Sequence, residues 1–156
     1  MTLQLIGQSR LEPTTSPAFK LGTRVVDKDG KEYLYVKSDS TGLTATKAAV
    51  VVDSSYTASM ATTTLALYGY PVGVPVSDIA ASCYGFIQVK GTCSLYVKAS
   101  CAANVRINST ATAGAPDDDG TAGAKVIEGA ALTTACGGSA AATAAILTYP
   151  RVGATL

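Results

Sequence analysis

Apolar and polar residues alternate along several short segments of this chain, with glycine, proline or aspartate between them. The clearest two segments are Arg24–Asp27 and Glu32–Lys37, which flank Asp29 and Gly30. An Asp-Gly pair suits the positive φ angles of a tight turn, so this stretch predicts a β-hairpin. Successive side chains of a strand point to opposite faces, which places tyrosines on one face of the second segment and aliphatic residues on the other.

Further segments with strand-like composition follow at short intervals. They cover residues 48–52, 84–90, 92–100, 103–114, 125–135 and 140–150, and residues 55–71 supply one or two more. Gly91 is expected to turn the chain between two of them, and residues 71–75, bracketed by prolines, are expected at a sheet edge or in a connection. Short strands at this spacing predict an all-β fold, an antiparallel β-sandwich or barrel of jelly-roll-like form.

Residues 1–18 differ from the rest of the chain. An apolar cluster precedes Pro13 and Pro17, which remove hydrogen-bond donors and disfavour helix. We therefore predict an extended N-terminal arm at 1–18 and a single β-domain at 19–156. The arm is expected to order along a partner surface through its apolar side chains, and a frayed terminus is the alternative. These partner-binding candidates are Leu3, Leu5, Ile6 and Leu11.

Charged residues make up only 15% of the chain, against about a quarter in ordinary soluble domains. Residues 130–150 contain none and are mostly alanine, threonine and glycine. Such a stretch is expected to pack against other copies or other proteins. The net charge of +1 gives no electrostatic footprint for nucleic acid or an anionic membrane. Threonine, glycine and serine interrupt 130–150 too often for a membrane span.

The chemistry that catalysis needs is poorly represented. Histidine is absent, which excludes every histidine-based triad, and no serine lies in a G-x-S-x-G motif. The few glutamates, and aspartates mostly in turn contexts, leave little for paired-carboxylate catalysis. We therefore predict that the protein is not an enzyme, has no catalytic residues and binds no cofactor.

The four cysteines, Cys83, Cys93, Cys101 and Cys136, show no C-x-x-C spacing. A zinc site would need all four thiolates from dispersed, strand-like positions, so no metal site is predicted. No export signal is visible at the start of the sequence, so free buried thiols are expected. A disulfide between neighbouring strands, such as Cys83 with Cys101, is the minor alternative.

The acidic triplet Asp117–Asp119, followed by Gly120, is the sharpest local feature. Its carboxylates are adjacent rather than alternately spaced and no glutamate closes the loop, so it does not match an EF-hand calcium site. We expect a solvated turn tip. An acidic contact for a basic surface on a partner is the alternative.

Four parts follow one another along the chain: the leading arm, the hairpin LGTRVVDKDGKEYLYVK, the block GVPVSDIAASCYGFIQVKGTCSLYVKAS, and an Ala/Thr/Gly-rich region that ends in LTYPRVG. In this order they resemble the head decoration, or cement, proteins of tailed bacteriophages. The resemblance covers most of the chain and is one of composition and order of parts.

The resemblance implies a structural virion protein on the capsid exterior, assembled in the host cytoplasm. It implies a homotrimer that bridges neighbouring major capsid subunits against internal pressure, without direct contact to nucleic acid or membrane. The alternatives are a phage tail, neck or host-binding protein, or a small carbohydrate-binding module in which tyrosines stack on sugars.

Overall fold

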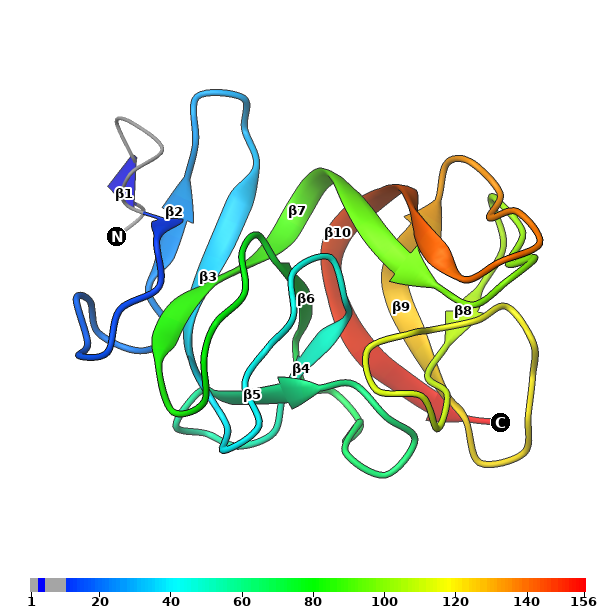
Figure 1. Cartoon of the computed structure of the whole chain (residues 1–156), viewed down its shortest axis with the longest axis horizontal. Coiled ribbons are helices and arrows are strands. Elements are labelled where there is room, and N and C mark those ends of the chain that lie inside the picture. The colour runs from blue at the N-terminus through cyan, green and yellow to red at the C-terminus, as the bar shows by residue number, and fades with distance from the viewer. Residues whose placement is uncertain (1–2, 5–10) are drawn as a thin grey trace.

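The computed structural model describes residues 3–4 and 11–156, and the strands that it contains form a nearly all-β molecule (Figure 1). The prediction of an all-β fold is therefore confirmed. The strands are β1 (Leu3–Gln4), β2 (Arg24–Val26), β3 (Glu32–Ser38), β4 (Ala49–Val51), β5 (Thr57–Met60), β6 (Val72–Pro75), β7 (Tyr84–Val97), β8 (Ile107–Asn108), β9 (Lys125–Leu132) and β10 (Ala141–Thr155). Within the described part of the chain, no helix is long and apolar enough to cross a membrane.

The strands belong to one sheet, and five of them pair in a closed ring. β3 pairs with β5, β5 with β4, β4 with β6, β6 with β7, and β7 with β3 again. The β1–β2 and β3–β5 pairs are parallel, so the sheet is mixed rather than wholly antiparallel as predicted. One buried cluster draws its members from the ring strands and two neighbouring loops: Leu34, Val36, Leu43, Ala49, Val51, Ala58, Ile79, Ile87 and Val89.

The predicted hairpin is present as β2 and β3, which pair antiparallel around a turn with Gly30 at a φ of 77°. Asp27 stabilises this turn, because its Oδ1 accepts hydrogen bonds from the backbone N–H groups of Asp29 and Lys31, both at 2.9 Å. The two faces of β3 also behave as predicted. Its tyrosines pack in one buried cluster with Phe86, and its aliphatic residues pack in the ring cluster.

The prediction that Gly91 reverses the chain is wrong. β7 continues through Gly91, which lies opposite Leu147 of β10. Gly91 has a φ of 96°, and a Cβ there would lie 2.9 Å from Cγ of Lys31. Glycine therefore allows a bend and a close approach inside a long strand, which its local sequence does not distinguish from a turn.

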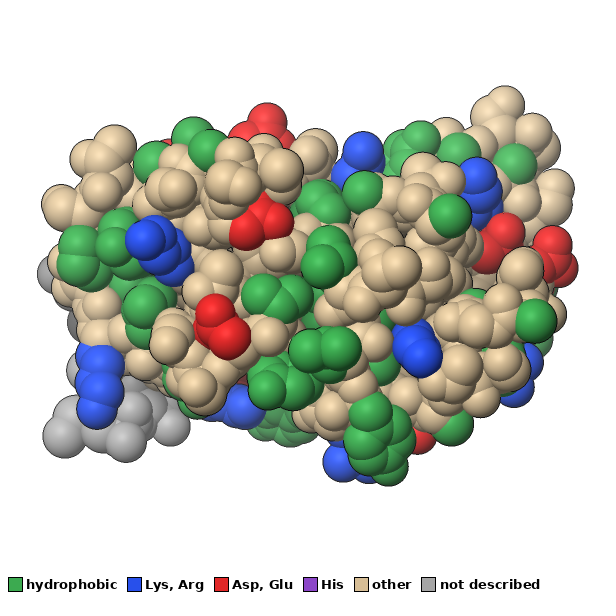
Figure 2. All heavy atoms as spheres, turned by 90° about the horizontal axis from the view of Figure 1, so that it is seen from below, with side chains coloured by type: hydrophobic (Ala, Val, Ile, Leu, Met, Phe, Trp, Pro, Cys, Tyr) green, Lys and Arg blue, Asp and Glu red, His purple; other side chains and the backbone are tan. Residues whose placement is uncertain are grey.

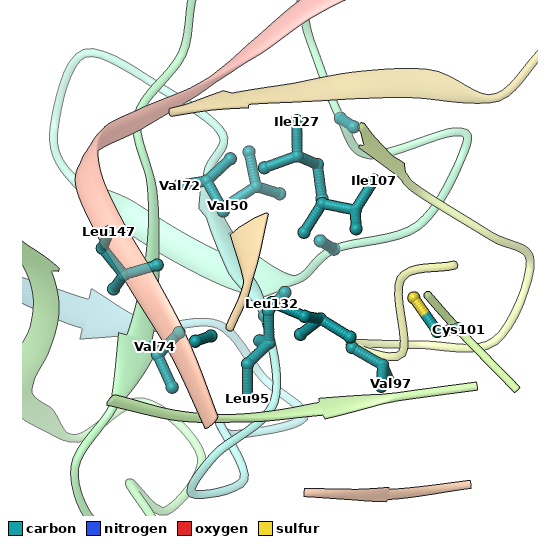
Figure 3. Packing of buried hydrophobic residues seen from close by; sticks show 14 of the residues in the cluster. Val50, Val72, Val74, Leu95, Val97, Cys101, Ile107, Ile127, Leu132 and Leu147 are labelled. Atoms are coloured by element: carbon teal, nitrogen blue, oxygen red, sulfur yellow. The ribbon is translucent and has the colours of Figure 1, made fainter. Parts of the chain in front are cut away.

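β10 is likewise longer than its predicted segment and continues to Thr155. Its pairing with β9 shifts register between Leu147 and Arg151, and this irregularity accommodates Pro150, which has no N–H to donate. β7 and β10 run through the middle of the molecule and connect the ring with β9 and β8 (Figure 1). The largest of the buried clusters includes Leu95 of β7, Leu132 of β9 and Leu147 of β10 (Figure 3).

Two other segments depart from expectation. β6 lies between β4 and β7 rather than at an edge or in a connection, because Pro71 and Pro75 at its ends use their carbonyls, which accept from the N–H groups of Val51 and Thr46. Residues 55–71, in contrast, form one strand, β5, within the one or two predicted, followed by a turn in which Ala66 N–H donates to the Thr62 carbonyl. Residues 103–114 contribute only the two-residue strand β8.

Candidate interaction surface

The middle of the outward face of β7, β10 and β9 is built mainly from small uncharged side chains, with Tyr96 opposite Ala142 and Lys90 opposite Thr148 toward its two ends. Along β10, Ala144 and Ile146 are exposed, whereas Ala145 between them and Leu147 after Ile146 are buried. Residues opposite each other in antiparallel strands share a face, which adds their cross-strand partners to the same surface. We call this surface the small-residue face, and it consists of Thr92, Ser94, Ala131, Ala142, Ala144 and Ile146.

Ile146 lies at the centre of the small-residue face, opposite Thr92 on one side and Ala131 on the other. Its side chain is 42% exposed, so covering it would contribute about 1 kcal/mol of hydrophobic free energy. The turn after β9 extends the uncharged surface with further exposed residues: Thr133, Thr134, Ala135, Gly137, Gly138, Ser139 and Ala140. The six residues of this face and the turn carry no charge, so a partner that covers them alone removes no charged group from water.

A second apolar surface projects from the loop between β5 and β6. Leu65, Leu67 and Tyr68 are exposed there, and Tyr68 is 79% exposed. Ala66 anchors the loop in the main core, and Gly69 N–H donates a 2.7 Å hydrogen bond to a carbonyl of β10. The sequence pattern predicted only one or two strands over residues 55–71 and did not indicate this surface. In the view of Figure 2, most of the charged side chains are separated by uncharged ones.

A charged cluster surrounds Tyr149 at the end of the small-residue face. The Tyr149 hydroxyl donates a 2.7 Å hydrogen bond to Glu32 Oε1, which also lies 3.2 Å from the Lys90 ammonium. The bond from Tyr149 is the main cause of a lowered pKa at Glu32. Arg24 and Lys90 each approach the Tyr149 ring, at 5.5 and 5.4 Å from its centroid. The structure thus brings together a group that the sequence pattern did not indicate.

An open hollow of about 300 Å³ adjoins this cluster, lined by Glu128, Gly129, Thr148, Tyr149 and Arg151. Arg151 Nε donates to Glu128 Oε2 at 3.0 Å, so the charges at its rim are already paired. The hollow arises where the backbone is irregular, because Gly129 and Tyr149 both have positive φ angles, 78° and 53°. Nothing in the local sequence marks Tyr149 for this conformation.

The predicted arm residues fall in three situations. Leu3 lies in β1, opposite Val25 of β2, whereas Leu5 and Ile6 lie outside the described residues. Leu11 packs, partly buried, against the aromatic cluster of the domain itself. Beyond it, Thr14 forms a two-way backbone bridge of 2.8 Å hydrogen bonds with Tyr84. Binding of these residues to a partner stays a prediction.

The four cysteines are unpaired in the structure. Cys101 and Cys136 are buried, and Cys83 and Cys93 are partly buried. Burial raises the pKa of both Cys93 and Cys101 to about 11, which keeps these thiols protonated at neutral pH.

The acidic loop is not simply a solvated turn tip. Asp119 is exposed, but Asp117 and Asp118 are partly buried, so the prediction is wrong for these two. Asp118 Oδ2 accepts a 3.1 Å hydrogen bond from the backbone N–H of Ala102. Burial, followed by the neighbouring Asp118 carboxyl group, raises the pKa of Asp117. Among the described residues, Cys101 and these two aspartates form a group of side chains close enough together to hold a metal ion.

Comparison with known proteins assigns no family, because no protein-family model and no curated protein matches this chain. Its function must therefore be inferred from its own surfaces. The surface on which we base the inference is the small-residue face with the uncharged turn beside it.

Proposed function

We propose that this protein is a structural component of a bacteriophage virion that decorates the capsid exterior and bridges neighbouring major capsid subunits as a homotrimer. The observation that carries the proposal is the uncharged small-residue face, centred on Ile146. Small side chains allow close approach of a partner, and the lack of charge avoids the desolvation penalty that opposes burial. A protein that functions by packing against neighbouring subunits needs such a surface.

The two apolar surfaces suit a protein with two kinds of neighbour. Gly69 of the exposed loop is bonded to Val152, six positions along β10 from Ile146. At about 3.4 Å for each strand residue, this separates the loop from the centre of the small-residue face by about 20 Å. We assign the small-residue face to contacts between copies and the Leu65–Tyr68 loop to the capsid.

Assembly into a trimer would strengthen attachment that depends on several weak contacts. Linking three copies raises the effective concentration of the second and third binding surfaces once the first is engaged. Rotation about one axis uses a heterologous interface that closes on itself after three copies. Modest affinity from each exposed loop then suffices for stable attachment to a lattice of capsid subunits.

The test is a charge placed in the small-residue face. Ile146→Glu should convert a trimer into a monomer in sedimentation-velocity experiments, because a carboxylate would have to be buried unpaired. Ala122→Glu, at an exposed position in the loop before β9, is the matched control and should leave the trimer intact. A wild-type protein that sediments as a monomer and does not bind capsids of its phage would overturn the proposal.

A small carbohydrate-binding module is the second candidate function. It is favoured by the exposed ring of Tyr68, since an exposed aromatic face can stack on a sugar. Binding of the wild type to a glycan array, lost in Tyr68→Ala and retained in Ile146→Glu, would support this alternative. In the capsid hypothesis, Tyr68→Ala weakens capsid binding and no glycan is bound.

A further inference from the structure

Three potential metal ligands meet where the acidic loop crosses the end of β7. The Sγ of Cys101 and carboxylate oxygens of Asp117 and Asp118 all lie within 4.8 Å of one another. Cys101 is fully buried and the two aspartates are partly buried. The salt bridges of the described residues involve Glu32 and Glu128, so neither of these aspartates forms a salt bridge with a described lysine or arginine.

A buried amide oxygen without a partner belongs to Asn108, whose amide nitrogen contacts the backbone of the acidic loop. Asn108 of β8 is fully buried, and its Oδ1 accepts no hydrogen bond. Its Nδ2 lies 3.4 Å from the carbonyls of both Asp118 and Asp119, which fixes the orientation of the amide, because the reverse would set oxygen against oxygen. A buried acceptor in this state destabilises the fold unless it gains a partner.

The backbone places this amide on the side of the carboxylates. Asn108 and Asp117 form an antiparallel bridge in which each N–H donates to the other's carbonyl, at 2.7 and 3.0 Å. Side chains of directly opposed residues in such a pair lie on the same face. The Asn108 side chain therefore shares a face with the Asp117 carboxylate.

We infer that Cys101, Asp117 and Asp118 form a zinc-binding site, with Asn108 Oδ1 as the fourth donor. One sulfur and three oxygens fill the tetrahedral coordination that zinc adopts in structural sites. A sulfur ligand disfavours calcium and magnesium, which prefer oxygen alone. Zinc bond lengths place neighbouring ligand atoms about 3.5 Å apart, so Cys101, Asp117 and Asp118, whose ligand atoms lie within 4.8 Å of one another, need to close by up to about 1 Å.

Zinc binding would deprotonate Cys101 and would link the segments that supply the ligands. The Cys101 S–H bond breaks, its proton passes to solvent, and the thiolate sulfur bonds to the metal. The ion would place positive charge between two adjacent carboxylates and give the buried amide oxygen a partner. It would thereby fasten the acidic loop to β8 and to the loop after β7 that contains Cys101.

The test uses the full-length protein, stripped of metal and kept reduced, with Co²⁺ as a spectroscopic probe for Zn²⁺. Wild type should develop the near-ultraviolet thiolate-to-cobalt charge-transfer band on titration, and Zn²⁺ should displace the cobalt and raise the melting temperature. Cys101→Ser should abolish the band. Cys136→Ser, at the other buried cysteine, is the matched control and should retain it.

Asp118→Asn provides a second variant in case Cys101→Ser does not fold. It keeps the shape of the side chain and an oxygen for the Ala102 N–H, and it should weaken Zn²⁺ binding at least tenfold. A wild-type protein that binds Co²⁺ without the charge-transfer band, that keeps the band in Cys101→Ser, or that binds Ca²⁺ but not Zn²⁺ would overturn the inference. Failure to bind any of these ions would overturn it equally.

Discussion

The hydroxyl of Tyr149 donates a 2.7 Å hydrogen bond to Oε1 of Glu32 across 117 positions of sequence. Glu32 begins β3, in the closed ring, and Tyr149 lies in β10, which is not a neighbour of β3 in the sheet. Tyr149 holds a φ of 53°, a costly conformation for an aromatic residue. The contact thus ties together two strands that both pair with β7 but not with each other, and we attribute the persistence of the strained conformation to it.

Removing this hydroxyl should raise the pKa of Glu32. In Tyr149→Phe the carboxylate loses the contact that contributes most to its lowered pKa, and the free energy of unfolding at pH 7 should fall by about 1 kcal/mol. Because the pKa of Glu32 is lowered in the folded protein, its contribution is present at neutral pH and is lost as the pH falls through that pKa. The variant should therefore lose less stability than wild type between pH 7 and pH 3.

Carboxyl-carbon NMR titration of Glu32, together with urea unfolding at the two pH values, checks this prediction. Tyr68→Phe, which alters an exposed tyrosine elsewhere, should leave the Glu32 titration unchanged. An unaltered Glu32 titration in Tyr149→Phe would show that Lys90 and Arg24 lower the pKa of Glu32 without the tyrosine.

Truncating a side chain on the buried face of β7 should destabilise the protein far more than truncating one on the exposed face. Leu95 is buried in the main core, whereas its neighbour Ser94 faces outward. Leu95→Ala should lower the free energy of unfolding by about 2–5 kcal/mol, because it leaves a cavity. Ser94→Ala should change it by less than about 0.5 kcal/mol. Denaturant unfolding measures both, and equal effects would mean that β7 is not oriented as described.

The fold was predictable where local sequence alone decides the structure. The hairpin at Gly30 follows from its Asp-Gly pair, and the faces of β3 follow from simple alternation. The prediction at Gly91 was wrong because a glycine with a positive φ angle occurs both in a chain reversal and in a bend within a strand. Only the pairing of β7 with β10 distinguishes the two cases. The prediction at Pro75 was wrong because the carbonyl of a proline at a strand end can accept a hydrogen bond from a neighbouring segment, although the proline has no N–H to donate.

The candidate surfaces were predictable to a similar extent. The absence of charge in residues 130–150 indicated the region of the small-residue face. It did not indicate the partners from β7, because strand register joins Thr92 to Ile146. The meeting of Cys101 with Asp117 was equally hidden, since the two belong to segments that only the tertiary fold brings together.

Cys93 should react slowly with thiol reagents in the native protein. Burial raises its pKa to about 11, and its thiolate fraction at pH 8 then falls about 100-fold relative to a thiol of pKa 9. Iodoacetamide labelling, followed by mass spectrometry of the Cys93 peptide, should show at least a tenfold lower rate in native than in guanidinium-unfolded protein. Equal rates would place Cys93 in a more open environment than the structure gives it.

Deleting residues 1–10 should weaken capsid attachment more than it weakens the domain. The deletion retains Leu11, which packs on the aromatic cluster, and Thr14, which pairs with Tyr84. We expect at least a tenfold loss of affinity for capsids and a shift of only a few degrees in melting temperature. A full-length variant with serine at Leu3, Leu5 and Ile6 should behave in the same way. Unchanged affinity in both would identify the N-terminus as a frayed end.

Gly129 should tolerate a side chain less well than another glycine with a similar backbone. Both Gly129 and Gly123 have positive φ angles, 78° and 87°, so alanine at either position costs about 1 kcal/mol in conformational strain. A Cβ at Gly129 would also lie 2.7 Å from the Thr148 carbonyl oxygen, whereas nothing lies within 4 Å of one at Gly123. Gly129→Ala should therefore destabilise the protein by at least about 1 kcal/mol more than Gly123→Ala, measured by urea unfolding. If the two variants unfold alike, the backbone around Tyr149 can relax, and the irregular pairing of β9 with β10 is not held in place by the close approach at Gly129.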